Sequence, residues 1–234
     1  MDQNKFIEEL KKINVTITQK QMDQLNKYYE LLKEWNEKIN LTAITEYDQV
    51  LLKHFYDSAT MNKVTDLTKV NTLCDIGTGA GFPGMVLKIL FPNLKVTLVD
   101  ALQKRVKFLN EIISQLELND IEVYHARAEE YARNHREKYD IVTARAVARL
   151  NIIMEYTIPM VKLNGYFIPL KGNISEEINS SNDAFEKLSC QLENVLEFQL
   201  PIEKSNRTIL KIKKTKPTSL KYPRSYAEIK KRPL

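Results

Sequence analysis

Cysteines and long apolar runs are scarce in this 234-residue chain, and each shortage excludes a class of protein. The two cysteines, Cys74 and Cys190, are too few for a disulfide framework, and there is no CxxC pair or Cys/His cluster to predict a metal site. No uncharged apolar run reaches the ~18–20 residues that a membrane span needs. Residues 1–13 are amphipathic and contain acids, unlike a signal or transit peptide. We therefore expect a cytoplasmic protein with no metal and no membrane partner.

Charge is unevenly distributed along the chain. The net charge is +5, but residues 210–234 hold nine Lys or Arg and only one acid, so the preceding part is net negative. A mildly acidic body with a basic end favours a polyanionic partner, and Tyr222 and Tyr226 among the cations could stack on unpaired bases. The alternative is a solvated terminus that binds nothing. The RNA-binding candidates in the tail are Arg224, Lys230, Lys231 and Arg232.

Residues 1–62 show a helical pattern, and the chain has no glycine before Gly77. Thr18 to Gln21 fits a capping box, in which the Thr and Gln side chains satisfy unpaired N–H groups at a helix start. Apolar residues then recur at spacings of three and four up to Ile39. A second helix is expected to start near Thr45 and to include His54 and Phe55.

From residue 71 the pattern changes to short apolar runs that alternate with helical segments. Repeated β-then-α units predict a parallel sheet with helices on both faces. The expected strand–helix pairs are Thr72–Ile76 with Met85–Phe91, Val96–Val99 with Val106–Leu116, Ile121–Tyr124 with Ala128–Arg136, Ile141–Thr143 with Ile152–Val161, and Tyr166–Leu170 with Ala184–Leu192.

The last two expected strands, Val195–Leu200 and Thr208–Ile212, have no helix-length segment between them. Strands joined by a short connection are antiparallel, so we expect the sheet to end in a hairpin. The predicted fold class is α/β, with a Rossmann-like core. Three segments are expected: a helical cap over 1–65 packed on the core, the Rossmann-like domain over 66–214, and a basic tail over 215–234.

A glycine-rich segment, Asp75 to Gly84, follows the first expected strand and precedes a helix, as a nucleotide-binding loop does. It contains Gly77, Gly79 and Gly81, and Pro83 suits a first helical position. Because the bare glycine spacing also matches a dinucleotide fingerprint, the neighbouring residues must decide which cofactor binds.

Carboxylates near the loop favour S-adenosylmethionine over NAD. An acid at the mouth of the loop, Asp75, would repel a pyrophosphate but suits a cofactor with an ammonium and a sulfonium. Asp100 ends the next strand and can accept hydrogen bonds from ribose hydroxyls, and Ala128-Glu129 follows the third strand, where loops reach the adenine. The alternatives are that Asp75 caps a helix and that Asp100 begins an Asx turn.

The acceptor side is predicted to be cationic. Arg127, Arg145, Lys171 and Arg207 all fall at strand ends or in loops, and such side chains pair with phosphates and with guanine O6 and N7. The sequence has no Asn/Asp-Pro-Pro-aromatic motif for an exocyclic amine, and both cysteines are expected in a strand or helix core. One or two of these cations could instead neutralise buried carboxylates.

A hydrolase is disfavoured. His54, Asp57 and Ser58 share a helix face, but adjacency does not build a nucleophile–base–orienter line, and no GxSxG motif exists. A network that orders the N-terminal helices is the better interpretation.

Taken together, the motifs resemble those of the bacterial small-subunit rRNA guanine-N7 methyltransferases of the RsmG, or GidB, type. The resemblance spans nearly the whole chain in order, with one departure at Ala227-Glu228, where such tails more often read Gly-x-Pro. The matching stretches are Trp35-Asn36, Asn40 to Ile44, His54 to Ser58, Asp75 to Gly84, Val99 to Ala101, Lys104-Arg105, Ala126 to Glu129, Thr143 to Ala148, Leu170 to Gly172, Tyr222 to Arg224 and Lys230 to Leu234.

The resemblance implies methyl transfer from S-adenosylmethionine to N7 of one guanine in 16S rRNA. By motif match it implies cofactor contacts from Gly77, Phe82, Ala128, Glu129 and Arg145. Guanine N7 has a free lone pair, so no general base is required. The expected partner is 16S rRNA, the small subunit or its assembly intermediate, and the protein is expected to be a monomer.

Within this framework the roles of the strand-end cations are hypotheses. Arg145 and Lys171 would position the base or its phosphate, while Arg127 and Arg207 would line the RNA entrance. The alternatives are a methyltransferase for another RNA atom or a small molecule, a dehydrogenase, and a non-catalytic RNA-binding module.

Overall fold

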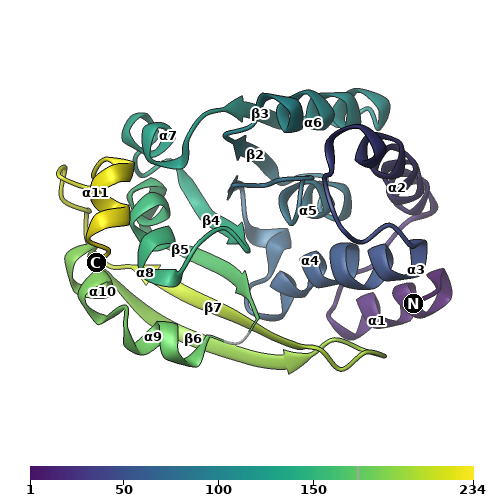
Figure 1. The fold of residues 1–234 in the computed structure, drawn as a ribbon. Helices are drawn as coiled ribbons and strands as arrows, with labels where there is room; N and C mark the ends of the chain where they lie inside the picture. Colours follow the sequence, from purple (N-terminus) through teal and green to yellow (C-terminus); the bar gives the residue numbers. More distant parts are fainter. Residues whose placement is uncertain (173) are drawn as a thin grey trace.

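The computed structural model describes residues 1–172 and 174–234, and its centre is a seven-stranded sheet in the order β3-β2-β1-β4-β5-β7-β6 (Figure 1). The predicted Rossmann-like α/β fold with a helical N-terminal extension is confirmed. The strands are β1 (Thr72–Ile76), β2 (Lys95–Asp100), β3 (Ile121–His125), β4 (Tyr139–Arg145), β5 (Val161–Lys171), β6 (Cys190–Gln199) and β7 (Asn206–Lys214).

Strands β1 to β5 are parallel, so their carboxyl ends meet along one edge of the sheet. β7 pairs antiparallel with both β5 and β6, which confirms the predicted terminal hairpin. The expected helix Ala184–Leu192 was wrong in its last part, because the helix ends at Lys187 and Cys190 begins β6. β6 is an edge strand with mostly exposed polar positions, so its apolar alternation in the sequence is weak.

The N-terminal helices form where the sequence predicts. Thr18 and Gln21 make the reciprocal capping box of α2, and Asn40 ends that helix in the left-handed conformation. The second helical region is a chain of short pieces rather than one α-helix. These first elements are α1 (Gln3–Lys12), α2 (Gln19–Ile39), α3 (Tyr47–Val50), the π-helical η1 (Leu51–Tyr56), α4 (Asp57–Ala59), η2 (Thr60–Lys63) and η3 (Leu67–Lys69).

The remaining helices connect and follow the strands. They are α5 (Gly84–Leu90), α6 (Gln103–Gln115), α7 (Ala128–Asn134), α8 (Leu150–Thr157), η4 (Ile158–Met160), α9 (Ser175–Asn179), α10 (Asn182–Lys187) and α11 (Tyr226–Lys231).

Alternate residues of the strands pack into two separate hydrophobic cores. Leu73 of β1 belongs to a cluster with the N-terminal helices, α5 and α6, whereas the next residue, Cys74, belongs to a cluster with α7, α8, α10 and α11. Successive side chains of a strand point to opposite faces, so each face of the sheet carries its own helical layer (Figure 1). Because the N-terminal helices share a core with the sheet, they form part of one packed body; the division at residues 65 and 214 stays a prediction.

The C-terminal segment packs against α8. Glu155 of α8 is fully buried and its carboxylate accepts hydrogen bonds from the Arg224 guanidinium at 2.8 and 2.7 Å. Ile229 of α11 is also fully buried, and Asn151 donates to the backbone carbonyl of Leu234 at 2.8 Å. This basic tail is therefore folded onto the sheet's second helical layer.

Candidate active site

The glycine loop joins β1 to α5 at the carboxyl edge of the sheet. Gly77, Gly79 and Gly81 all have positive φ, a conformation that residues with a Cβ rarely adopt. Gly81 also has no room for a side chain, because an added Cβ would lie 2.5 Å from the Tyr28 hydroxyl. Tyr28 of α2 donates a hydrogen bond to Ala80 of the loop, so the N-terminal helices support the loop directly.

Asp75 organises this loop from below. Its Oδ2 accepts hydrogen bonds from the Thr78 hydroxyl at 2.6 Å and from the Gly84 amide at 2.9 Å, so it caps the start of α5. Pro83, expected at the first helical position, precedes Gly84 as the N-cap residue.

The expectation that Asp75 stands at the mouth of the loop was wrong. The residue is fully buried, and its Oδ1 has no hydrogen-bond partner among the described residues. Burial raises the pKa of its carboxyl to about 6, although the hydrogen bonds from Thr78 and Gly84 oppose this shift. The carboxylate therefore supports the loop from inside the protein. The sequence could not show this, because the same pattern of an acid at the end of a strand occurs whether the side chain points into the protein or out of it.

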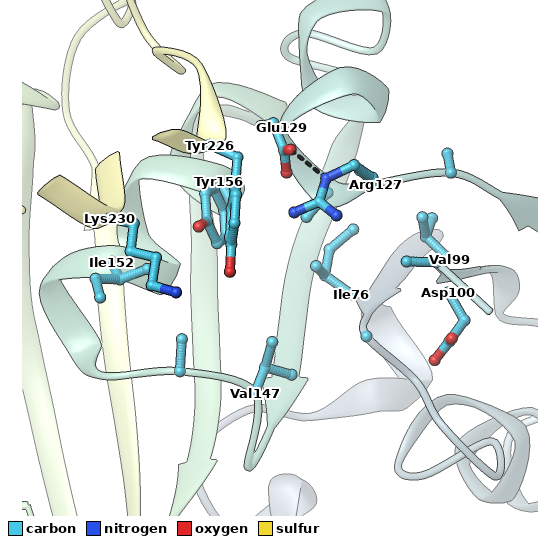
Figure 2. A pocket seen from close by; sticks show the side chains of 15 residues that line it. Ile76, Val99, Asp100, Arg127, Glu129, Val147, Ile152, Tyr156, Tyr226 and Lys230 are labelled. Atoms are coloured by element: carbon cyan, nitrogen blue, oxygen red, sulfur yellow. Dashed lines mark hydrogen bonds and ion pairs between the residues drawn. The ribbon is translucent and has the colours of Figure 1, made fainter. Parts of the chain in front are cut away.

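A cavity of about 320 Å³ opens beside the loop (Figure 2). Its floor is mainly apolar, with two carboxylates and two cations at its sides, which suits a nucleoside with polar edges. The lining residues are Ile76, Gly77, Val99, Asp100, Ala101, Ala126, Arg127, Ala128, Glu129, Val147, Ala148, Ile152, Tyr156, Tyr226 and Lys230.

Asp100 lines this cavity and also fixes the loops around it. Its Oδ2 accepts from the Gly79 amide at 2.9 Å and pairs with Arg105 at 3.4 Å, while Oδ1 accepts from the Leu102 amide at 2.9 Å. The last contact is the Asx turn that the sequence left as an alternative. Asp100 is thus a structural acid as well as a candidate for ribose.

Of the other sequence candidates, Gly77, Ala128 and Glu129 line the same cavity, whereas Gly79, Gly81 and Phe82 are not part of its lining. Arg127 donates from Nε to Glu129 Oε1 at 2.7 Å, and its guanidinium lies 4.2 Å from the centre of the Tyr226 ring. Arg127 therefore lines the first cavity, and its role at an RNA entrance stays a prediction.

A second cavity, of about 350 Å³, lies on the other side of the segment that follows β4. Three of the predicted acceptor-side cations, Arg145, Lys171 and Arg207, line it together. Its remaining lining residues are Ile44, Lys53, His54, Asp57, Ala146, Leu170 and Gly172.

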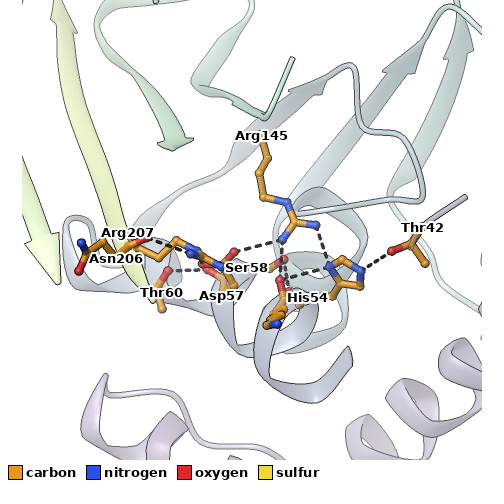
Figure 3. A network of polar contacts seen from close by, with 9 residues as sticks. Thr42, His54, Asp57, Ser58, Thr60, Arg145, Asn206 and Arg207 are labelled. Carbon is orange, nitrogen blue, oxygen red and sulfur yellow. Dashed lines mark hydrogen bonds and ion pairs between the residues drawn. The ribbon is translucent and has the colours of Figure 1, made fainter. Parts of the chain in front are cut away.

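The floor of the second cavity is a network of charges (Figure 3). The Asp57 carboxylate accepts from Arg207 Nε at 3.0 Å and pairs with Arg145 Nη1 at 3.4 Å. The Arg145 guanidinium also donates to the Lys53 carbonyl at 3.1 Å and lies 5.0 Å from the centre of the Phe82 ring. Arg145 and Arg207 are therefore held in place by a carboxylate, as the sequence allowed for one or two of these cations.

His54 is a neutral member of this network. Burial, followed by the nearby charge of Arg145, lowers the pKa of its imidazole to about 3. His54 Nδ1 lies 3.2 Å from Arg145 Nη2 and 3.2 Å from the Lys53 carbonyl oxygen. On the other side of the ring, Nε2 lies 2.9 Å from Thr42 Oγ1. Ser58 donates to the His54 backbone carbonyl instead of the ring, so these residues form no hydrolase triad.

Lys171 connects the second cavity to the segment after β4. Its ammonium donates to the Ala148 carbonyl at 2.6 Å and to Glu177 at 2.8 Å. Glu177 also accepts from the Leu150 amide at 2.7 Å, at the start of α8. Lys171 thus holds the segment that forms a wall of both cavities.

The basic side chains of the C-terminal tail differ in their surroundings. Arg224 is paired with Glu155, Lys230 lines the first cavity, and Lys231 and Arg232 are exposed. Among the described residues, no group of three His, Cys, Asp or Glu side chains could hold a metal ion, and none of the described helices is long and apolar enough to cross a membrane.

Several lining residues of the first cavity were not among the sequence candidates, and Val147, Tyr156 and Tyr226 are three of them. Val147 packs on Gly77, where an added Cβ would lie 2.8 Å from a Val147 methyl. In the sequence Tyr226 stands out only as an aromatic among cations, a signal that points to nucleic acid as readily as to a nucleoside pocket.

Comparison with known proteins gives a consistent result. The family model GidB, described as rRNA small subunit methyltransferase G, matches residues 21–209. A protein of Lysinibacillus sphaericus is 46% identical over 237 residues, which cover 100% of both chains. One from Bacillus subtilis is also 46% identical, over 100% of this chain and 99% of the relative. Both are named ribosomal RNA small subunit methyltransferase G.

Solved structures support the fold. A SAM-dependent methyltransferase from Aquifex aeolicus superposes with a TM-score of 0.52 at 18% identity, over 71% of this chain and 93% of that chain. TYW2 of M. jannaschii, solved in complex with AdoMet, gives a TM-score of 0.51 at 15% identity, over 61% and 67%.

Proposed function

Because the chain belongs to the rRNA small subunit methyltransferase G family, we propose that it transfers the methyl group of S-adenosylmethionine to N7 of a guanine in 16S rRNA. The enzyme class, the cofactor and the rRNA substrate follow from the family. The guanine N7 and the roles of individual residues are the specific parts of the proposal.

One observation carries the proposal: two cavities of different chemistry meet at the segment 145–148. Val147 and Ala148 line the apolar cavity beside the glycine loop, while Arg145 and Ala146 line the cationic one. A methyl donor in the first cavity and a nucleotide in the second would face each other across this short segment. Such an arrangement suits transfer of one carbon between two bound molecules, because alignment alone supplies much of the rate.

The first cavity fits S-adenosylmethionine. Apolar side chains such as Val99 and Ile152 offer surfaces for the purine, Asp100 offers a carboxylate for ribose hydroxyls, and Glu129 can accept from the adenine amine. When bound, the cofactor supplies an electrophilic methyl group on a sulfonium. The methionine part would extend past Gly77, which lines the cavity together with Val147.

The second cavity suits a guanine nucleotide. Arg145, Lys171 and Arg207 offer N–H donors for a phosphate or for the O6 and N7 edge of the base. Guanine N7 carries no proton at neutral pH, so the chain needs no base to activate it. His54 is neutral and its ring nitrogens are both engaged, so it is assigned to orient Arg145 rather than to transfer a proton.

An rRNA substrate also indicates where the reaction takes place. We place the enzyme in the cytoplasm as a monomer, acting on 16S rRNA in the small subunit or in an assembly intermediate.

The test is transfer of a radiolabelled methyl group to rRNA, followed by nucleoside analysis. The expected product is 7-methylguanosine; label on any other atom overturns the N7 assignment. Calorimetry with S-adenosylmethionine and with NAD is expected to give binding only for the former.

Arg145→Ala and Lys171→Ala test the acceptor roles. Both are expected to lower kcat/KM for rRNA by at least tenfold. Lys69→Ala is the matched control, since it removes an exposed cation just before β1, at the opposite edge of the sheet. Wild-type kcat/KM in both site variants contradicts the assignment.

A further inference from the structure

The C-terminal helix α11 forms one wall of the cofactor cavity. Tyr226 and Lys230 lie one turn apart on this helix and both line the cavity (Figure 2). They face Arg127 and Glu129, which come from the start of α7 more than ninety residues earlier. The resemblance and the family comparison assign no cofactor contact to this part of the chain, and the family model ends at residue 209.

The position of α11 is fixed by several independent contacts. Ser225 and Glu228 form a reciprocal capping box, and Ile229 is fully buried against the second core. The Arg224 guanidinium binds the buried carboxylate of Glu155 through two nitrogens and also donates to the Arg232 carbonyl at 2.9 Å. A bidentate contact to a buried carboxylate is among the strongest polar anchors a chain can make. Tyr226 and Lys230 are therefore held at the cavity by the fold.

The chemistry of this wall matches an adenine ring. Tyr226 gives an aromatic surface, one part of which already packs against the Arg127 guanidinium at 4.2 Å. The described residues show no ion pair for Lys230, so its ammonium can donate to a purine ring nitrogen. Glu129, held by Arg127, supplies the acceptor for the exocyclic amine.

We propose that Tyr226 and Lys230 contact the adenine of S-adenosylmethionine, so that α11 sets cofactor affinity and is not only an RNA-binding element. This inference rests on the proposed function, because it takes the first cavity as the site of the methyl donor. Stacking of a base on an aromatic side chain is worth about 1–3 kcal/mol, or roughly five- to 150-fold in affinity.

Calorimetry of the full chain with S-adenosylmethionine tests the proposal. Tyr226→Ala is expected to raise the Kd at least tenfold, Lys230→Ala severalfold, and Tyr226→Phe less than twofold. Lys231→Ala is the matched control: it removes the same charge from the next position of α11, which is exposed and does not line the cavity, and it is expected to leave the Kd unchanged.

Steady-state kinetics distinguish a cofactor contact of Tyr226 from a purely structural role. If Tyr226 contacts the cofactor, Tyr226→Ala raises KM for S-adenosylmethionine while kcat at saturating cofactor stays near the wild-type value. Unchanged Kd values in both Tyr226→Ala and Lys230→Ala overturn the inference, even if rRNA binding weakens, since the helix would then act on RNA alone. Absence of binding by the wild-type chain would instead overturn the proposed function.

Discussion

Asp57 is the single carboxylate between two arginines of the second cavity, and replacing it tests the network directly. The residue is 5% exposed, with Arg207 Nε at 3.0 Å from Oδ1 and Arg145 Nη1 at 3.4 Å from Oδ2. Asp57→Asn keeps the shape of the side chain and removes its charge. Both guanidinium groups then lie in a partly buried site without their counter-charge, which raises the free energy of the folded state.

The magnitude follows from burial and geometry. Removing one partner of a fully buried pair costs about 3–5 kcal/mol. The side chains of Arg145 and Arg207 are 16% and 22% exposed, and one of the two contacts is long. We therefore expect Asp57→Asn to lower the free energy of unfolding by about 2–3 kcal/mol, after discounting for solvent screening.

Urea denaturation of a double-mutant cycle measures this effect. Asp57→Asn combined with Arg207→Gln is expected to give a coupling free energy of about 1–2 kcal/mol. The control cycle uses Glu193 and Lys211, which pair at 3.2 Å on the surface of the hairpin and should couple by about 0.5 kcal/mol. A coupling no larger than in the control cycle refutes the reasoning.

Three further predictions concern the loop, its helix and the tail. Burial raises the pKa of the Asp75 carboxyl to about 6, so its contribution to stability is fully present below about pH 4 and is lost as pH rises through 6. In urea denaturation the free energy of unfolding of the wild type should fall by on the order of 3 kcal/mol, relative to Asp75→Asn, between pH 4 and pH 7.5. A difference between the two proteins that does not change with pH contradicts this. Gly84→Ala places a Cβ 2.4 Å from a methyl group of Leu98 in β2, and it should lower the free energy of unfolding by about 1–3 kcal/mol in the same assay. The control is Gly172→Ala, whose added Cβ has nothing within 4 Å and should change the free energy of unfolding very little. Equal effects of the two substitutions would refute the packing argument. Replacing Lys231 and Arg232 together by Ala should make the logarithmic salt dependence of rRNA affinity shallower by about 0.7–0.9 for each phosphate that these side chains neutralise, measured by filter binding; an unchanged slope removes these two residues from the RNA interface.

The parallel part of the fold could be predicted from the sequence because each buried strand is a short apolar run with a helix-length segment after it. β1 was predicted at its observed bounds, Thr72–Ile76. The helix predicted to start near Thr45 came out as α-, π- and 3₁₀-helical pieces, since an apolar stripe does not distinguish these close relatives. β6 began earlier than expected because an edge strand needs few apolar residues.

The candidate site shows a different limit. Residue types and strand ends placed Arg145, Lys171 and Arg207 at one edge of the sheet. Arg145 and Lys171 end the parallel strands β4 and β5, and Arg207 reaches the same edge because it stands near the start of the antiparallel strand β7. The direction in which a side chain points was beyond the sequence, so Asp75 was expected in the site but lies beneath it. The role of Tyr226 depends on the docking of α11 more than fifty residues after the last parallel strand, a long-range contact with no local signature.

The residues that line the first cavity are spread along the chain from Ile76 to Lys230. A growing polypeptide emerging from its own ribosome can therefore assemble the sheet and the glycine turn well before the last side of the pocket exists. Until Arg224 and α11 have been translated and have docked on α8, the first cavity lacks one wall, and a fusion partner attached close to Leu234 would lie beside that wall.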